Sequence, residues 1–226
     1  EYRLDSIMHC SPKPLLTLGH GIVMGGGYGL FSASKYRVLT ERSRLAFPEI
    51  TIGLFPDAGG TVVMRKLAPK MAALLTLTGS QVNATDALAL GIGTHVVGHD
   101  ARADFLSGLT QLAWRIGAPK DNNEVLEHYV AQQAYIGDMP DSDVAGINLH
   151  RIDLTSLSAC ADSILALEGA SKWMDRGAAN LRAGCPITAG IIFKQLSLGP
   201  MMDLAECFMT ELAVANNCLS RPDFAE

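Results

Sequence analysis

The chain has 226 residues, of which 48% are hydrophobic and 18% are charged. This composition is typical of one sizeable globular domain, or of a domain with a small appendage. The formal net charge of −5 argues against a surface that binds nucleic acid or an anionic membrane. We therefore expect its partners to be small molecules or copies of itself, with no nucleic acid and no membrane among them.

The five cysteines are odd in number, widely spaced and free of any C-x-x-C pairing. They predict neither a disulfide framework nor a zinc site, and they favour a reducing compartment. The histidines show none of the spacings typical of metal ligands, so we assign no metal. No apolar run approaches the roughly 18 to 20 residues needed to span a bilayer. The sequence thus predicts a soluble intracellular protein.

The chain begins at Glu1 rather than Met, within a helical pattern of apolar residues. We therefore expect an amino-terminal part of the fold to be absent. Residues 14 to 18 form a short apolar run, which predicts a buried strand that enters a turn at Gly19. After the triplet Gly25-Gly26-Gly27, residues 26 to 35 have helical spacing, and residues 36 to 39 are β-branched or aromatic enough for another strand.

The glycine triplet should therefore join a strand to a helix. Its amide N–H groups would carry the unpaired donors and the positive end of the helix dipole, which can stabilise an oxyanion. The alternative is a tight turn that needs positive φ or close packing, and the triplet alone leaves both open. The dinucleotide fingerprint G-x-G-x-x-G fails at Leu30 and at Ser32, and neither a phosphate-binding loop nor a G-x-S-x-G elbow is present.

Further along, residues 45 to 47 predict a brief strand that Pro48 cuts, placing Glu49 on a loop. Helices are then predicted at 61 to 67, at 70 to 77 with an end at Gly79, and at 85 to 91 with Thr85 as N-cap, before a strand at 95 to 97. Beyond residue 100 the chain should be mainly helical, with helices near 103–116, 122–134, 159–175 and 201–219. We therefore divide it into residues 1–100 and 101–226.

The most informative segment is 48–60, where Glu49 and Asp57 stand among apolar residues and glycines. A carboxylate is costly to bury unless another group pairs with it or a reaction uses it. Two prolines and Gly53 prevent one continuous helix, so a loop must bring the two side chains together. The alternatives are that Glu49 caps a helix or forms an ion pair, and that Asp57 is the N-cap of the helix that follows.

Several motifs occur in a fixed order over residues 1 to 100. They are Lys13-Pro14, Gly21-x-x-Met24-Gly25-Gly26-Gly27, Phe47-Pro48-Glu49-x-x-Ile52-Gly53-Leu54-x-Pro56, Gly59-Gly60, Leu77-Thr78-Gly79, Ala84-x-Asp86-Ala87 and Gly91-x-x-x-x-Val96-Val97. This series resembles the crotonase, or enoyl-CoA hydratase/isomerase, superfamily. The resemblance implies an α/β fold with a ββα spiral core, here without its N-terminal strands, followed by a mainly helical C-terminal region.

Within that superfamily the details resemble the 3-hydroxyisobutyryl-CoA hydrolase branch. Gly29 stands where a hydratase carries its first catalytic glutamate, and Asp57 stands where hydratases commonly have glycine. The late segments Ile187-Thr188-x-x-Ile191-x-x-Lys194-Gln195-Leu196 and Arg221-Pro222-Asp223-Phe224 are also similar to that branch. A hydration mechanism that uses two glutamates is therefore not expected.

The resemblance implies a role for each motif residue. The N–H of Gly26 would be one oxyanion donor, Glu49 would attack the thioester carbon or activate water, and Asp57 would orient the acyl hydroxyl or assist proton transfer. The second oxyanion donor and much of the adenine and phosphate pocket would lie before residue 1. The residues expected to contact substrate are Gly25, Gly27, Tyr28, Leu54 and Phe55.

The implied function is hydrolysis of a short 3-hydroxyacyl-CoA thioester, with 3-hydroxyisobutyryl-CoA of valine catabolism as the expected substrate. No metal or redox cofactor is expected, because the substrate is already activated as a thioester. Coenzyme A is part of that substrate. The resemblance also implies a homotrimer or hexamer, in the bacterial cytoplasm or the mitochondrial matrix. Two alternatives remain: an enoyl-CoA hydratase or isomerase in which Glu49 alone handles protons, and a non-catalytic binding or assembly protein.

Overall fold

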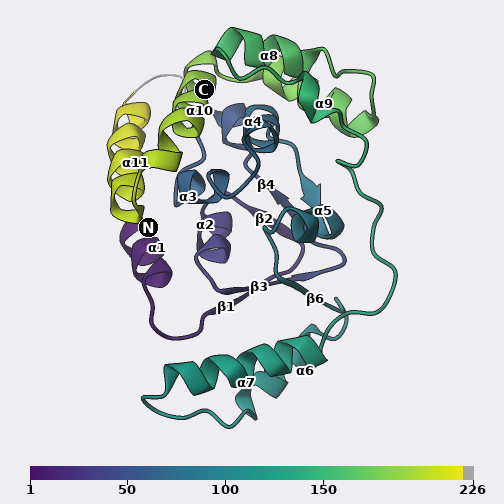
Figure 1. Cartoon of the computed structure of the whole chain (residues 1–226), viewed down its shortest axis with the longest axis vertical. Helices are drawn as coiled ribbons and strands as arrows, with labels where there is room; N and C mark the ends of the chain where they lie inside the picture. The colour runs from purple at the N-terminus through teal and green to yellow at the C-terminus, as the bar shows by residue number, and fades with distance from the viewer. Residues whose placement is uncertain (221–226) are drawn as a thin grey trace.

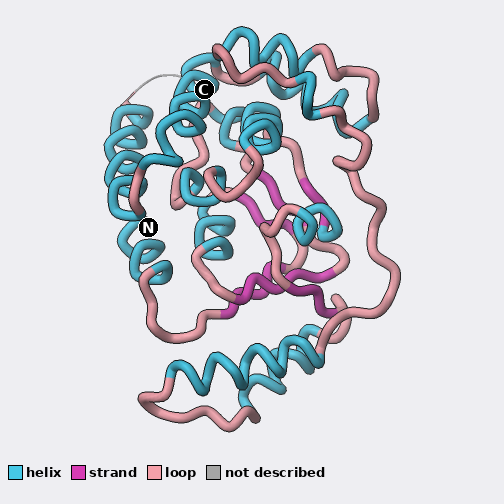
Figure 2. The backbone as a smooth tube through the Cα atoms, viewed as in Figure 1, coloured by secondary structure: helices cyan, strands magenta, loops and turns pink. Residues whose placement is uncertain are grey.

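The computed structural model describes residues 1–220. The segment Arg221-Pro222-Asp223-Phe224, part of the predicted similarity, lies outside the described residues. Figure 1 and Figure 2 show short strands at the centre, helices on several sides of them, and two helices set apart at one end.

The strands form two three-stranded sheets, with orders β1-β3-β6 and β2-β4-β5. The first sheet is wholly parallel, whereas in the second β2 and β4 are parallel and β5 is antiparallel to β4. The strands are β1 (Leu16–Gly19), β2 (Ile22–Met24), β3 (Tyr36–Thr40), β4 (Arg44–Ala46), β5 (Val82–Asn83) and β6 (His95–Val97).

Successive turns of the chain repeat the same path from the first sheet to the second. The corner between β1 and β2 has Gly21 at φ +75°, a conformation that glycine adopts without a steric penalty. The corner between β3 and β4 lies beside it, because the Ser43 hydroxyl donates to Gly19 O (2.6 Å) and Arg44 N donates to Gly21 O (2.7 Å). The predicted ββα spiral is confirmed.

Helices alternate with or flank these strands. They are α1 (Tyr2–His9), α2 (Gly26–Ser32), α3 (Gly60–Met64), α4 (Pro69–Thr78) and α5 (Ala84–Ala89). The prediction missed β2 as a separate strand, so the strand that leads into the glycine helix is β2 rather than residues 14 to 18. α4 ends as predicted, with Gly79 in the left-handed conformation at φ +59°.

The predicted N-cap of α5 is wrong. Asn83 caps this helix, because its side-chain oxygen accepts the N–H of Asp86 (3.1 Å). Thr85 lies inside the helix and donates its hydroxyl proton to Pro140 O (2.6 Å) instead. This bond ties the long segment before α8 to α5.

Beyond residue 100 the structure is helical, as predicted, but with different boundaries. The helices are α6 (Arg102–Thr110), α7 (Pro119–Gln132), α8 (Leu157–Leu165), α9 (Lys172–Ala183), α10 (Pro186–Leu198) and α11 (Leu204–Leu219). The predicted helix 159–175 is two helices, since Gly169 has φ +86° and Ser171 starts α9 by accepting Met174 N–H (3.1 Å). The prediction gave no helix for α10.

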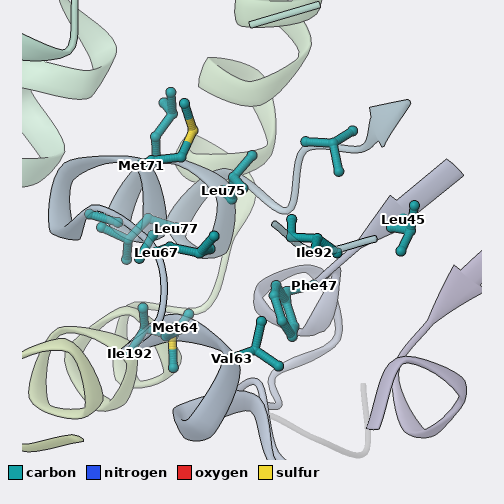
Figure 3. Close-up of a cluster of buried hydrophobic side chains, with 14 of the residues drawn as sticks. Leu45, Phe47, Val63, Met64, Leu67, Met71, Leu75, Leu77, Ile92 and Ile192 are labelled. Atoms are coloured by element: carbon teal, nitrogen blue, oxygen red, sulfur yellow. The ribbon is translucent and has the colours of Figure 1, made fainter. Parts of the chain in front are cut away.

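Helices from both parts of the chain share one hydrophobic core. Ile164 of α8 and Ile192 of α10 are fully buried in the same cluster as Leu45 of β4 and Leu77 of α4. Figure 3 shows Ile192 beside Met64 of α3. A second cluster packs α6 and α7 against β3 and β6. Residue 100 therefore marks a change from sheet to helix rather than a boundary between separate cores.

If α10 is an integral part of this core, then Ile192→Ala should lower the free energy of unfolding by about 2–5 kcal/mol, the usual cost of removing a buried Ile side chain. Ile187→Ala on the same helix is the matched control, because Ile187 is 42% exposed. Chemical denaturation of both variants checks this. Equal losses would contradict the packing of α10 into the core.

Candidate functional site

The glycine turn lies at the start of α2. Gly25 is the N-cap with φ +54°, which confirms the tight-turn interpretation for this residue. The first backbone hydrogen bond of this helix is donated by Tyr28 N to Gly25 O (2.8 Å). The N–H groups of Gly26 and Gly27 come before it in the chain and are not part of this first bond. Such amides at a helix start are available to accept negative charge from a ligand.

Glu49 lies beside this glycine turn. It begins a short 3₁₀ helix, η1 (Glu49–Ile52), which ends at Gly53 with φ +71°. The prediction of a plain loop is therefore wrong, because residues after Pro48 coil into one tight turn. A Cβ atom placed on Gly25 would lie 4.0 Å from Glu49 Oε1. The fold thus brings the first predicted carboxylate to the predicted donors.

The Glu49 carboxyl group is buried at 4% exposure, and its Oε2 has no hydrogen-bond partner in the described part of the chain. Neither alternative role applies, since η1 is preceded by Pro48 without a side-chain cap and no ion pair of residues 1–220 involves Glu49. Burial raises the pKa of Glu49 to about 7, and the negative charge of Asp57 adds to this shift. Glu49 can therefore give or take a proton near neutrality.

Asp57 is partly buried and accepts a hydrogen bond from the Tyr2 hydroxyl (2.7 Å). It does not cap the following helix, because Gly59 is the N-cap of α3. The turn after Asp57 is unusual: Ala58 has φ +49° although it carries a Cβ, and Gly59 has φ +89°. Asp57 is therefore free of a capping role and is held by a side chain 55 positions earlier.

Sequence reasoning missed the polar inward face of α1. Tyr2 binds Asp57, and Asp5 is fully buried with no partner for either oxygen among the described residues. Burial, followed by the charge of Glu1, raises the pKa of Asp5 to about 6. Leu4 and Ile7 of the same helix are exposed. The apolar pattern indicated a helix but did not show which of its faces is buried.

Glu211 of α11 is the other residue that the sequence did not reveal. Its carboxylate is 1% exposed and accepts the N–H groups of Gly59 and Thr61, both at 2.8 Å. It therefore caps the start of α3 from about 150 positions away. Burial raises its pKa, and these hydrogen bonds oppose the shift. No local sequence signal could have shown this contact.

Gly29 has no room for a side chain. A Cβ atom there would lie 2.5 Å from Ala58 O and 2.9 Å from Ala58 Cβ. Because the nearest atom belongs to the backbone, a longer side chain would force α2 away from the Asp57 turn. At the position that the resemblance assigns to a hydratase glutamate, the backbone of Gly29 thus packs directly against that of Ala58.

The other predicted substrate contacts occupy different surroundings. Tyr28 is buried in the core, where its ring lies 4.2 Å from that of Phe47 between centroids, and burial raises its pKa. Phe55 lines a cavity of about 380 Å³ between α10 and α11, together with Thr61 and Glu211. That cavity's lining includes neither Glu49 nor Asp57.

Of the remaining predicted contacts, Leu54 is partly buried against the main core, and Gly27 is exposed at the start of α2. The Glu1 side chain contacts the position where Gly26 would carry a Cβ atom. The structure thus gathers Gly25, Gly26 and Glu49 at one place. Contact of Tyr28, Leu54 and Phe55 with a substrate stays a prediction.

Residues 1–220 contain no group of three or more His, Cys, Asp or Glu side chains placed to hold a metal ion. In the same part of the chain, no helix combines the length and the apolar character needed to cross a membrane.

A model of the enoyl-CoA hydratase/isomerase family matches residues 1–226. The chain belongs to the enoyl-CoA hydratase/isomerase family. Proteins named mitochondrial 3-hydroxyisobutyryl-CoA hydrolase are similar to it: that of Xenopus laevis is 32% identical over 231 residues, and that of Homo sapiens is 30% identical over 232 residues. Each match covers 100% of this chain but 58% of the relative. The chain thus spans less than two thirds of the length of these relatives.

Solved structures of the family share its fold. A carnitinyl-CoA dehydratase from Mycobacterium thermoresistibile aligns with a TM-score of 0.82 at 24% identity, covering 100% of this chain and 63% of that one. An enoyl-CoA hydratase from Rhodobacter sphaeroides aligns with a TM-score of 0.78 at 22% identity, covering 99% of this chain and 61% of that one. These likenesses confirm the predicted fold.

The capping role of Glu211 predicts a graded loss of stability. Glu211→Ala leaves the buried N–H groups of Gly59 and Thr61 without their acceptor and should lower the free energy of unfolding by about 3 kcal/mol. Glu211→Gln keeps one acceptor oxygen and should lose less. Chemical denaturation measures both changes, and an alanine variant as stable as the native protein would disprove the cap.

The raised pKa of Glu49 predicts how stability depends on pH. Its ordinary pKa is 4.5, so the folded state binds this proton more tightly than the unfolded state. The resulting stabilisation is complete below pH 4.5 and is lost as pH rises through about 7, a change of about 3 kcal/mol. Glu49→Gln should remove this part of the pH dependence. Chemical denaturation at pH 5 and pH 8 gives the difference in free energy of unfolding between the native protein and the variant at each pH. A difference that is the same at both pH values would contradict the burial of Glu49.

Proposed function

We propose that the protein to which this chain belongs hydrolyses a short 3-hydroxyacyl-CoA thioester, with 3-hydroxyisobutyryl-CoA as its substrate. The observation that carries the proposal is the buried Glu49 carboxyl group beside the glycine turn, whose Oε2 has no hydrogen-bond partner among residues 1–220, with Asp57 contributing to its raised pKa. The choice of the 3-hydroxyisobutyryl group is supported by the name that relatives about 30% identical share.

The chemistry follows from these groups. Glu49, once ionised, takes a proton from water that attacks the thioester carbon, or attacks that carbon itself. In the second route the acyl group is left on Glu49 as an anhydride, which water then cleaves to the free acid. The Gly26 N–H donates to the oxygen on which negative charge develops. Asp57, held by Tyr2, orients the acyl hydroxyl or moves a proton. The leaving thiolate is stable enough to depart with little help from an acid.

Gly29 favours hydrolysis over hydration. Hydration with two glutamates needs a second carboxylate there, and the contact with Ala58 leaves no space for one. An enoyl-CoA isomerase that uses Glu49 alone remains the second candidate, because one buried base can move a proton between two carbons. A non-catalytic family member would have no use for a buried, unpaired carboxyl group, which costs stability.

The proposal includes no metal and no redox cofactor, since the substrate is already activated as a thioester. Coenzyme A enters as part of the substrate. We further propose a homotrimer or hexamer acting in valine catabolism. The relatives named mitochondrial support the matrix as its location in a eukaryote, and the cytoplasm is the equivalent in a bacterium.

Release of free thiol from 3-hydroxyisobutyryl-CoA by the full-length protein tests the proposal. Glu49→Gln and Asp57→Asn should each lower kcat by about 100-fold or more, the usual contribution of general acid–base groups. The native rate should rise as pH passes about 7, where Glu49 ionises. Asp104→Asn, which changes an exposed carboxylate of α6, is the matched control and should keep the native rate.

Crotonyl-CoA provides the contrary outcomes. Loss of its enoyl absorbance without thiol release from the hydroxyacyl substrate would replace the hydrolase with a hydratase. If neither thiol release nor loss of enoyl absorbance is seen, while circular dichroism shows an intact fold, the non-catalytic alternative would be favoured.

A further inference from the structure

A polar pocket of about 350 Å³ lies between the end of α4, strand β4 and helix α9. We call it the α9 pocket. Its lining contains neither Glu49 nor Asp57, and the proposed hydrolysis does not use it. The residues that line it are Arg44, Gly79, Ser80, Gln81, Asp143, Lys172, Trp173, Arg176 and Asn180.

Three cations face this pocket against one carboxylate, in a chain whose net charge is −5. Arg44, Lys172 and Arg176 form no ion pair within residues 1–220. The single carboxylate, Asp143, accepts a hydrogen bond from Asn83 Nδ2 (3.0 Å). Arg44 also donates to Ser43 O (3.1 Å), but no carboxylate of residues 1–220 forms an ion pair with the three cations, so the pocket keeps an excess of positive charge.

The start of α9 carries two cations and one carboxylate, Asp175, which accepts the Gly169 N–H (2.7 Å). Lys172 is the first residue of this 12-residue helix, where the helix dipole disfavours a cation. Arg176 follows four positions later, and like charges at that spacing repel. Arg44 adds a third cation from β4. A bound anion would reduce the repulsion among these three cations and would be favoured by the helix start, where Ser171 already accepts the Met174 N–H.

The shape and chemistry of the pocket indicate the class of ligand. Two guanidinium groups and an ammonium group match the several oxygens of a phosphate group. The Trp173 N–H already donates to Gln81 O (2.6 Å), so its indole offers the pocket only an apolar ring. We infer that the α9 pocket binds a phosphate-bearing small molecule.

The pocket also borders the segment that carries Glu49. Gly79 lines it, and a Cβ atom there would lie 3.4 Å from Pro48 Cα and 3.5 Å from Ile50 Cγ2. At the far end of α9, Cys185 N donates to Ile50 O (3.2 Å). A ligand of the α9 pocket thus contacts elements that pack directly on η1.

Titration calorimetry on the full-length protein at low salt tests the site, with pyrophosphate and adenosine 3′,5′-bisphosphate as probes. Saturable binding is expected, and Arg44→Gln, Lys172→Gln and Arg176→Gln should each weaken it about tenfold, the usual loss for a charged hydrogen bond. Arg182→Gln is the matched control, because Arg182 is exposed on the same helix but pairs with Glu168. It should bind within about twofold of the native protein.

Absence of saturable binding of both probes would overturn the inference, as would an equal loss in Arg182→Gln. Thermal unfolding of each variant shows whether a loss of binding reflects a loss of fold. Binding and thermal unfolding are measured without turnover. They therefore test the α9 pocket even if the protein does not hydrolyse the proposed substrate.

Two sources could supply the phosphate, and kinetics separates them. If the phosphates of coenzyme A occupy the pocket, Arg176→Gln should raise KM for the acyl-CoA but not for the matching acyl-pantetheine. If a separate phosphate ester occupies it, both KM values should stay unchanged while probe binding is lost. Either result supports the site.

Discussion

The close approach of α2 to the turn at Asp57 is the constraint on which the site depends. Gly29 lets the helix backbone reach Ala58, whose positive φ shapes that turn. Because two main chains meet here, the helix that begins at the glycine turn packs directly against the turn that follows Asp57. A side chain at this contact would move α2 away from the Asp57 turn.

Burial then determines the electrostatics of the region. Glu49, Asp5 and Glu211 are all nearly inaccessible, and each has a raised pKa because water is excluded from it. They differ in what compensates this cost. Glu211 is bound by two N–H groups and supports α3, whereas Glu49 keeps an unpaired oxygen. Asp5 is also unpaired, so the position of Glu49 beside the glycine turn, and not the missing partner alone, distinguishes it from the other buried carboxyl groups.

The same helices serve the core, the site and the α9 pocket. α9 packs on η1 on one side and presents cations on another, while α11 carries Glu211 to the start of α3. Elements after residue 100 therefore do more than cover the sheets. They hold the backbone next to Glu49 and Asp57, because Cys185 N donates to Ile50 O and Glu211 accepts the Gly59 N–H.

Local chemistry allowed the sequence to determine much of this protein. Strand and turn residues predicted several individual elements, and the ordered motifs predicted the ββα spiral through their resemblance to the crotonase superfamily. The same resemblance named Glu49 and Asp57 as candidate site residues. Only the tertiary structure decided which face of α1 is buried, that Asn83 rather than Thr85 caps α5, and that Tyr2 and Glu211 support the Asp57 turn. Those contacts join residues that are distant in sequence or compete with equally good local caps, so no pattern within a short window could distinguish them.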